Sequence, residues 1–358
     1  IEVAERLERS SERALAHALM ALSRERTAPE RDAASDLWRT VLFEADHEAL
    51  VRIAAARLAS APTASHAALQ SEADALLNSV HRAILDGRTE FAFRQLRVIR
   101  LGYPSTTAAS DADRLRRRLI APYRLSSAPG FGVETARTLH RAGAWREAAE
   151  ELEGNVGSEA RLLRIDALTR GGFAAEAIAA AESYRADLPG GVLAEDLPET
   201  VTAALHPIVH RALFAAAADS YRVDPAALMA FCRAATRFDP SYHEGFRLGI
   251  GATDVEALAF ARDFPSAPRL VPADLLTPAR AIEATAWLWS LMAGQIGETN
   301  PVRIAGALLV GPGLVPAGRA MDDLEWIAAV PFREARDRLL DFTASLTRYR
   351  VLLPAPSP

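Results

Sequence analysis

Five carboxylates in the C-terminal half of the chain could supply acid and base chemistry. They are Asp239, Glu244, Asp254, Glu256 and Glu283. A conventional glycosidase needs two carboxyl groups at a set separation across a cleft. The spacing of these residues indicates no such pair, and helix caps or solvated helix faces explain them more simply. A hydrolytic site formed by two of these carboxylates is an alternative hypothesis.

Histidines that could bind a metal ion lie in the same half of the chain. His206 and His210 are four residues apart and could share a helix face, with His243 as a third ligand. No glutamate follows in a His-Glu-x-x-His arrangement, and Pro207 comes directly after the first histidine. We therefore expect an ordinary helix start here and no metal site.

The other groups that could react or bind a ligand favour structural roles. Cys232 has no evident base beside it, so we expect a buried, unreactive thiol. The segment Gly249–Ala252 contains two glycines but follows no predicted strand, which gives little support to a nucleotide-phosphate site. The tryptophans lie at helical spacing, typical of core residues rather than of rings stacked on sugars. We predict no cofactor.

The composition is that of a globular protein and excludes one class of partner. The chain has 358 residues, of which 50% are hydrophobic and 24% charged. That length is enough for two domains with cores of their own. A net charge of −5 supplies no basic surface for phosphate contacts, so we expect no nucleic-acid partner.

The sequence predicts neither a membrane span nor a disulfide. A spanning helix needs roughly 18 consecutive apolar residues, and the most apolar stretch, Ile304–Ala317, is broken by glycines and prolines. The single cysteine excludes an internal disulfide and a cysteine-based zinc site. The chain starts at Ile1 with no basic-then-apolar leader, so we expect either a removed signal peptide or a fragment.

Helical periodicity runs through almost the whole sequence and predicts an all-α fold. Apolar residues recur at i, i+3, i+4 and i+7, and no alternating β-branched run competes with them. The first predicted helices cover Val3–Arg24, Arg31–Phe43, His47–Ala59, Ser65–Leu85, Glu90–Leu101 and Asp111–Ile120. Breakers end them, including the stretch Pro122–Gly132. Two later helices are predicted to start at Asp224-Pro225 and Thr277-Pro278, where each pair supplies an N-cap and an N1 proline.

A weak internal repeat predicts that the N-terminal part is an α-helical solenoid of TPR-like helix hairpins. Gly143-Ala144-Trp145 is echoed by Gly171-Gly172-Phe173, and small alanines follow each copy. The glycine would end one helix, the aromatic residue would fix the turn, and the alanines would allow close approach. An irregular helical bundle is the alternative. The glycines and prolines of Leu188–Pro198 mark a domain boundary, giving domains 1–198 and 199–358.

From His206 onward, the order of motifs resembles the transglycosylase domain of the soluble lytic transglycosylases. The resemblance covers about 150 residues and rests on Tyr221–Pro225, Leu228-Met229-Ala230, Arg233 and Phe238-Asp239-Pro240. It implies a goose-lysozyme-like fold. In that family the helix carries a Glu-Ser pair, and the glutamate protonates the glycosidic oxygen. This chain has Ala235 and Thr236 at those two positions.

Further departures from the family pattern fall where its saccharide cleft would lie. Thr253 or, with a two-residue deletion, Gly251 takes the place of a glutamine, and Thr285 replaces a glycine. The other altered positions are Ala281, Leu308, Leu309 and Ala328, in place of Asn, Tyr, Asn and Glu. These changes are toward small or apolar groups, which cannot fix a sugar as polar groups do.

Other family positions are retained, and we interpret them as a scaffold around the place of the family's saccharide cleft. The retained residues are Arg233, Phe238, Gly311, Pro312, Gly313, Glu334 and Arg336. Glu334 and Arg336 are too close on a helix to face each other, so we expect each to fix a different neighbouring element.

The resemblance with these losses implies a catalytically inactive protein, because a methyl group cannot transfer a proton. We expect a scaffold or protein-binding module of the periplasm or cell envelope, with other envelope proteins as partners, in a machine such as a flagellar motor or secretion system. Leu308, Leu309 and Val310 favour a cleft covered by protein over a wet glycan groove. A non-cleaving peptidoglycan-binding protein and a glycosidase with a rebuilt acid site are the alternatives.

Overall fold

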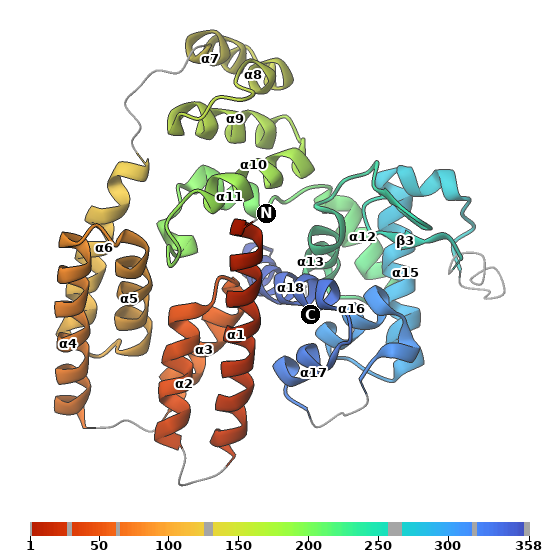
Figure 1. Cartoon of the computed structure of the whole chain (residues 1–358). Helices are drawn as coiled ribbons and strands as arrows, with labels where there is room; N and C mark the ends of the chain where they lie inside the picture. The colour runs from red at the N-terminus through yellow and green to blue at the C-terminus, as the bar shows by residue number, and fades with distance from the viewer. Residues whose placement is uncertain are drawn as a thin grey trace. The chain divides into compact units, whose positions relative to one another are not determined.

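The computed structural model describes residues 2–26, 31–61, 65–124, 132–256, 267–316 and 321–353. The described chain is built of helices with one very small sheet, so the predicted all-α class is confirmed (Figure 1). It divides into two compact units. Unit 1 comprises residues 1–167 and 180–202, and unit 2 comprises 168–179 and 203–358.

The helices of the first part of the chain follow the predicted periodicity closely. They are α1 (Glu2–Glu25), α2 (Arg31–Glu44), α3 (Glu48–Ser60), α4 (His66–Leu85), α5 (Thr89–Gly102), α6 (Thr107–Arg124), α7 (Val133–Arg141), α8 (Trp145–Glu151), α9 (Ser158–Arg170), α10 (Ala174–Ala186), η2 (Ala194–Asp196) and α11 (Glu199–Leu205). One predicted break is wrong in position, because α6 continues past Pro122 to Arg124. Residues 125–131 of the predicted breaker stretch lie outside the described residues.

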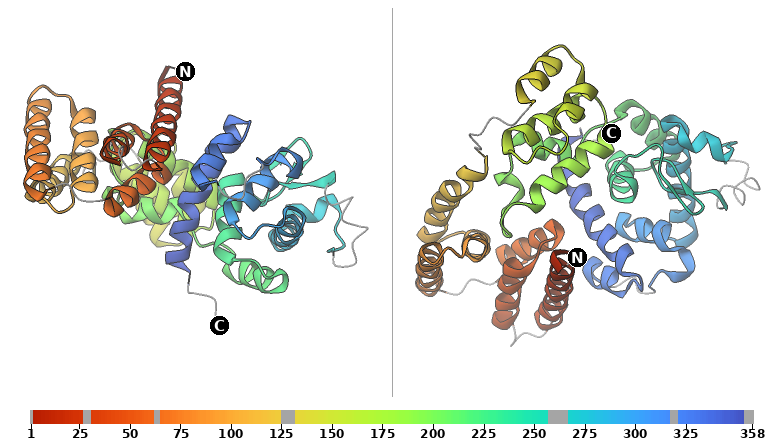
Figure 2. Two further views of the ribbon diagram at one scale, coloured as in Figure 1. Left: turned by 90° about the horizontal axis from the view of Figure 1, so that it is seen from below. Right: turned by 45° about the horizontal axis from the view of Figure 1, so that its top comes forward.

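Helix α2 packs against α1, α3 and α5, and the red and red-orange helices α1 to α3 lie side by side in Figure 2. Two arginines of α5 close the C-terminal end of α2. The Arg97 guanidinium donates to the carbonyl oxygens of Leu42 and Phe43 at 2.5 and 3.0 Å. Arg94 donates to the Phe43 carbonyl oxygen at 3.0 Å and pairs with Asp46 at 2.8 Å. These donors satisfy carbonyl groups that the end of any helix leaves without partners.

The predicted glycine turn is present at both copies of the repeat, but its register differs by one residue from the prediction. Gly143 and Gly172 have matching φ values of 79° and 77°, the left-handed conformation that ends a helix. Ala144 N–H donates to the carbonyl of residue 139, and Phe173 N–H to that of residue 168, both at 3.0 Å. Phe173 therefore corresponds to Ala144 and not to Trp145.

A buried ion network ties α5, α6 and η2 together within unit 1. Arg116 of α6 is 4% exposed and pairs with Asp196 of η2, which is 2% exposed. Arg116 also pairs with Asp113 on its own helix at 2.7 Å. Arg100 of α5 pairs with Asp113 and with the more exposed Glu195.

The elements of unit 2 surround one central, fully buried helix. They are α12 (Arg211–Tyr221), α13 (Pro225–Thr236), β1 (His243–Glu244), β2 (Arg247–Leu248), β3 (Thr253–Asp254), η3 (Pro272–Leu276), α15 (Pro278–Ile296), α16 (Pro301–Val310), η4 (Pro312–Leu314), α17 (Asp323–Ala329) and α18 (Arg333–Leu352). The central helix is α13, which packs along α18 and against α12. Because α13 is covered on all sides, its sequence is apolar at nearly every position.

The two predicted proline starts are confirmed as helix starts. Asp224 accepts a hydrogen bond from Ala226 N–H at 2.8 Å, with Pro225 at the first helical position of α13. Pro278 has the same place in α15, although the Thr277 side chain makes no capping hydrogen bond. The α15 helix reaches Ile296, beyond the predicted end near Met292.

The three short strands form an antiparallel sheet in the order β1-β2-β3. Glu244 is paired with Arg247, and Arg247 in turn with Asp254. Each strand has two residues, too few to show the alternation that predicts a strand from sequence. The sheet was therefore not predicted, although it carries part of the site described below.

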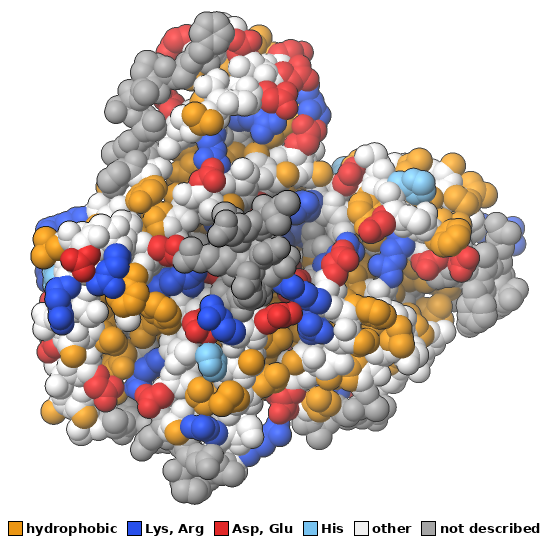
Figure 3. Space-filling view, viewed as in Figure 1, with side chains coloured by type: hydrophobic (Ala, Val, Ile, Leu, Met, Phe, Trp, Pro, Cys, Tyr) orange, Lys and Arg blue, Asp and Glu red, His pale blue; other side chains and the backbone are white. Residues whose placement is uncertain are grey.

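No helix among the described residues is long and apolar enough to cross a membrane. Blue and red side chains are interspersed on the face shown in Figure 3, so positive and negative charges are mixed on that face.

Candidate functional site

Ala235, at the position where the resembled family carries its acid, lies inside α13 and is 6% exposed. The next residue, Thr236, directs its hydroxyl into the protein. Its oxygen donates to the carbonyl oxygen of Cys232 at 3.1 Å and also contacts the carbonyl oxygen of Ile250. The Glu-Ser pair of the family is therefore replaced by a methyl group and a hydroxyl that anchors a neighbouring loop.

The anchored loop, residues 249–251, packs tightly against η3 and α15. A Cβ atom on Gly251 would overlap the hydroxyl of Thr285, and one on Gly249 would overlap the carbonyl of Leu275. Gly249 also has a φ of +69°, which side-chain-bearing residues rarely adopt. Ile250 between them is fully buried. The loop thus contributes to the core rather than presenting polar groups to a ligand.

The other altered family positions are mostly buried as well. Thr253 is 2% exposed and Ala281 is fully buried. Leu308 packs against a cluster of Trp287 and Leu288, while Leu309 is 8% exposed. Ala328 of α17 is half-buried. Of these residues, only Leu309 lines the groove described next.

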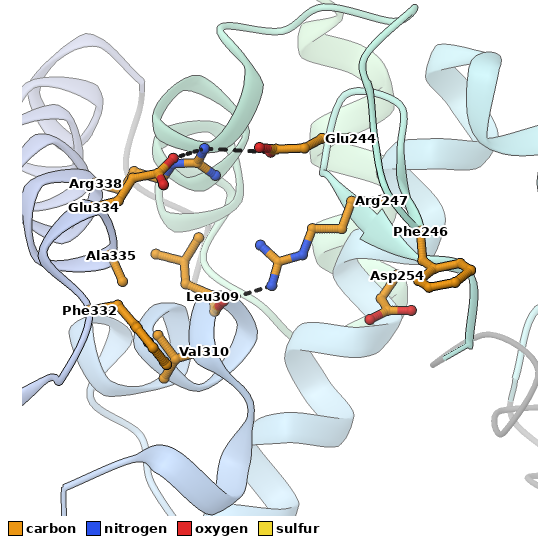
Figure 4. A pocket seen from close by; sticks show the side chains of 10 residues that line it. All are labelled: Glu244, Phe246, Arg247, Asp254, Leu309, Val310, Phe332, Glu334, Ala335 and Arg338. Carbon is orange, nitrogen blue, oxygen red and sulfur yellow. Dashed lines mark hydrogen bonds and ion pairs between the residues drawn. The ribbon is translucent and has the colours of Figure 1, made fainter.

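A groove of about 400 Å³ lies between the small sheet and the C-terminal helices of unit 2 (Figure 4). One wall is formed by α16, α18 and the residue that precedes α18, and it is largely apolar. The other wall comes from the sheet and is largely charged. The lining residues are Glu244, Phe246, Arg247, Asp254, Leu309, Val310, Phe332, Glu334, Ala335 and Arg338. This volume falls in the range of ligand sites.

Arg338 joins the two walls at one end of the groove (Figure 4). Its guanidinium pairs with Glu334 at 2.6 Å and with Glu244 at 3.7 Å. The Tyr242 hydroxyl also donates to the Glu244 carboxylate. This hydrogen bond, outweighing a small effect of burial, and the nearby Arg338 hold the pKa of Glu244 below its ordinary value. Glu244 is therefore ionised at neutral pH and is a poor proton donor.

Arg247 reaches from β2 across the middle of the groove (Figure 4). Its Nη2 donates to the main-chain carbonyl oxygen of Leu309 at 2.7 Å. That carbonyl lies in the last turn of α16, where intrahelical partners run out. Arg247 therefore satisfies a helix end while its charge stays inside the groove.

The retained family residues act mainly as structural supports. Arg233 is 7% exposed and donates to the carbonyl of Leu205 at 2.7 Å. Phe238 is 3% exposed, has a φ of +63°, and its ring meets Phe214 and Tyr349 edge-on. Gly311 ends α16 with a φ of +89°, and Pro312 and Gly313 begin the short helix η4.

The predicted separate roles of Glu334 and Arg336 are confirmed for the arginine only. Arg336 donates to the carbonyl oxygen of Val330 at 2.9 Å and so fixes the turn before α18. Glu334 instead pairs along its own helix with Arg338 and lines the groove. Among the described residues, Glu334 is the one retained family position that the groove exposes to a ligand.

The structure brings two of the five candidate carboxylates, Glu244 and Asp254, to the groove. Asp239 accepts hydrogen bonds from the backbone and hydroxyl of Ser241, as a turn residue does. Glu283 pairs with Arg280 on α15, and Glu256 follows β3 with its backbone N–H bonded to Asp254.

The candidate metal and thiol sites have structural explanations. Within the described ranges, no group of three His, Cys, Asp or Glu side chains is arranged to hold a metal ion. The ring of His206 packs edge-on against Tyr349, and burial lowers the pKa of His210. Cys232 is buried, and burial raises the pKa of its thiol, so the thiolate nucleophile is disfavoured. Trp287, Trp289 and Trp326 are buried, as predicted.

Sequence reasoning missed the groove residues that now matter most. Arg247, Arg338 and Phe246 were assigned to no family motif, and Phe332, which matches a retained motif residue of the family, was not expected to face a ligand. Phe246 and Phe332 are 66% and 53% exposed, which is unusual for aromatic side chains. An available signal was the run of charged and aromatic residues from His243 to Arg247, which is interrupted by Gly245 and followed by Gly249 and Gly251.

Comparison with known proteins finds similar solved structures. No protein-family model and no curated protein matches the chain. The chain is similar to an inactive variant of lytic transglycosylase Slt from Pseudomonas aeruginosa, with a TM-score of 0.46 and 16% identity over 100% of this chain and 59% of that one.

It is also similar to the 70 kDa soluble lytic transglycosylase from Escherichia coli, with a TM-score of 0.48 and 16% identity over 91% of this chain and 53% of that one. The complex of a 70 kDa soluble lytic transglycosylase with bulgecin A gives a TM-score of 0.48 and 16% identity, over 90% of this chain and 54% of that one. The chain thus spans less than two thirds of the length of these proteins.

Proposed function

We propose that this protein is a non-catalytic, lytic-transglycosylase-like scaffold that binds other proteins. The burial of Ala235 within α13 carries the proposal, because the position expected to donate a proton holds a methyl group without access to the groove. Two of the three groove carboxylates are held in ion pairs that do not suit a proton donor. Glu244 and Glu334 are both paired with Arg338, and the pKa of Glu244 is lowered, opposite to the shift a general acid needs.

We place this scaffold in the periplasm or cell envelope. The motif order of unit 2 supports this location, since the proteins that it resembles act on the cell wall. A role as a structural part of an envelope machine, such as a flagellar motor or secretion system, extends the same proposal.

Purified sacculi give the direct test of inactivity. The 358-residue chain, incubated with sacculi, should release no muropeptides above a heat-killed control. Release above that control would overturn the proposal. A matched pair, Ala235→Glu and Ala235→Gln, asks whether the acid alone is missing. We expect both variants to be equally inactive, because Ala281, Leu308 and Leu309 lack the polar groups that fix a sugar. Turnover in the glutamate variant alone would show a more complete cleft than we infer.

One observation favours a second candidate, a protein that binds peptidoglycan without cleaving it. Phe246 and Phe332 expose their rings at the groove, and sugars stack on aromatic faces. Co-sedimentation with sacculi separates the two candidates. Firm retention that Phe246→Ala and Phe332→Ala both weaken would favour the glycan-binding function and count against a purely protein-binding scaffold.

A further inference from the structure

We propose that the groove of unit 2 binds an extended segment of a partner protein in which an acidic residue lies two positions from a large apolar one. Arg247 would hold the carboxylate. This inference rests on the proposed protein-binding function and specifies the chemistry of the partner.

Two arginines and three carboxylates line the groove, and of the arginines Arg247 is the one available to a ligand. Asp254, the third carboxylate, lies opposite Arg247 in the sheet without forming an ion pair with it. Arg338 already pairs with two carboxylates, Glu244 and Glu334. In the described part of the chain, Arg247 has no carboxylate at ion-pair distance, and its effect on Glu244 is a longer-range attraction. Its one hydrogen bond goes to the neutral carbonyl oxygen of Leu309. A guanidinium has five N–H donors, so donors remain for a bidentate contact with a carboxylate.

The wall opposite the sheet supplies the apolar half of the recognition. Leu309, Val310, Phe332 and Ala335 line it, and the Phe332 ring is half exposed. Phe246 exposes a second ring on the sheet side. Exposed rings beside a groove gain free energy when a partner's apolar side chain covers them.

The groove fits a peptide better than a neutral sugar. A neutral glycan offers no charge to Arg247, whereas an acidic side chain pairs with it in a partly buried setting, where charge-assisted hydrogen bonds are strong. In an extended segment, residues two positions apart point to the same side. An acidic residue and an apolar residue at that spacing can therefore reach Arg247 and the Leu309–Val310 wall together.

Selection from a random hexapeptide display library tests the proposal with the full chain as bait. Arg247→Gln serves as the counter-selection bait. We expect enrichment of peptides with Asp or Glu two positions from Leu, Phe or Val. Failure to enrich any peptide, or enrichment of the same peptides by both baits, would overturn the inference.

Fluorescence anisotropy of one enriched peptide and its Glu-to-Gln or Asp-to-Asn counterpart then isolates the charge. The wild-type chain should bind the acidic form about tenfold more tightly, the effect of one charge-assisted hydrogen bond. Arg247→Gln should abolish that preference, and Arg247→Lys should keep part of it, because lysine cannot make the bidentate contact. Arg280→Gln is the matched control and should keep the full preference, since Arg280 lies on α15 outside the groove and pairs with Glu283.

Three other results would overturn this inference while leaving the inactive scaffold intact. A preference for the acidic peptide that persists in Arg247→Gln would remove the arginine from recognition. Chitin oligosaccharide that competes with the peptide would assign the groove to glycan. Self-association of the full chain that Arg247→Gln abolishes would make a second copy the occupant. Muropeptide release by the wild-type chain, in contrast, would overturn the proposed function itself.

Discussion

Two regions of the molecule use the same residue types with opposite consequences. In unit 1, Arg116 and Asp196 form an ion pair whose side chains are 5% and 3% exposed. In unit 2, Arg338 pairs with Glu334 and Glu244, whose side chains are 74% and 61% exposed. The first pair is enclosed by helices and the second stands at the rim of a groove.

The difference in burial decides what each group of charges can do. A buried charge that loses its partner leaves an uncompensated ion in a medium that cannot solvate it, which costs several kcal/mol. When a surface ion pair loses one partner, water solvates the charge that remains. Such a pair therefore contributes about 0 to 1 kcal/mol to stability. We therefore assign the unit 1 network to stability and the groove charges to recognition.

The largest expected effect is the loss of Asp196. Asp196→Ala removes a partner of Arg116 and the acceptor for Leu193 N–H, bonded at 3.1 Å. The free energy of unfolding should fall by about 3 kcal/mol, because among the described residues the buried Arg116 keeps only Asp113 as a carboxylate partner and the buried Leu193 N–H loses its acceptor. Urea unfolding followed by circular dichroism measures this change.

The neighbouring Glu195 provides the matched control. It pairs with Arg100 but its side chain is 51% exposed, so Glu195→Ala should cost less than about 1 kcal/mol. Equal destabilisation by the two substitutions would show that burial does not govern this network, and the contrast with the groove would fail.

A substitution in the packed loop of unit 2 should have an intermediate effect. Gly251→Ala places a methyl group against the Thr285 hydroxyl and methyl, so something must shift. Overpacking of this kind costs about 1 to 3 kcal/mol. We expect a lower thermal midpoint with unchanged peptide binding in the groove, because neither residue lines it.

Thr285→Ala tests whether the contact between the new methyl group and Thr285 causes the loss of stability in Gly251→Ala. In the double variant the new methyl group has room, so the combined loss of stability should be smaller than the sum of the single losses. Strict additivity of the two would place the strain elsewhere, for example in the loop backbone.

Long-range periodicity made the helices predictable, while the groove depended on contacts that periodicity does not encode. The starts of α13 and α15 were evident from Asp224-Pro225 and Thr277-Pro278. Each of these signals is local, with the cap and the helix adjacent in sequence.

The groove joins residues that are far apart in the sequence. Arg247 and Leu309 are separated by 62 positions, and their contact ends on a main-chain carbonyl that any residue could supply. The order of motifs identified Ala235 as altered and assigned Arg233 and Phe238 to the retained scaffold, and both of these side chains are buried. Motif position thus predicted which residues hold the fold better than which residues face a ligand.

The smallest expected effect concerns Glu244, and it completes the contrast with Asp196. Glu244→Gln should lower the free energy of unfolding at pH 7 by less than about 1 kcal/mol, because the carboxylate is largely exposed. The folded-state pKa of Glu244 lies below its ordinary value of 4.5, so the ionised form is the one the fold favours. Its contribution is therefore present above pH 4.5 and is lost as the pH falls through the lower, folded-state pKa.

The difference in stability between wild type and Glu244→Gln should accordingly disappear in acid, which urea unfolding at a series of pH values measures. In an Arg338→Gln background the same substitution should have a still smaller effect, since the Arg338 charge that lowers the pKa of Glu244 is gone. A loss at pH 7 as large as that of Asp196→Ala would mean that the groove charges hold unit 2 together. Charges that the fold requires would be assigned to stability rather than to binding a partner, so that result would count against the groove as a recognition site.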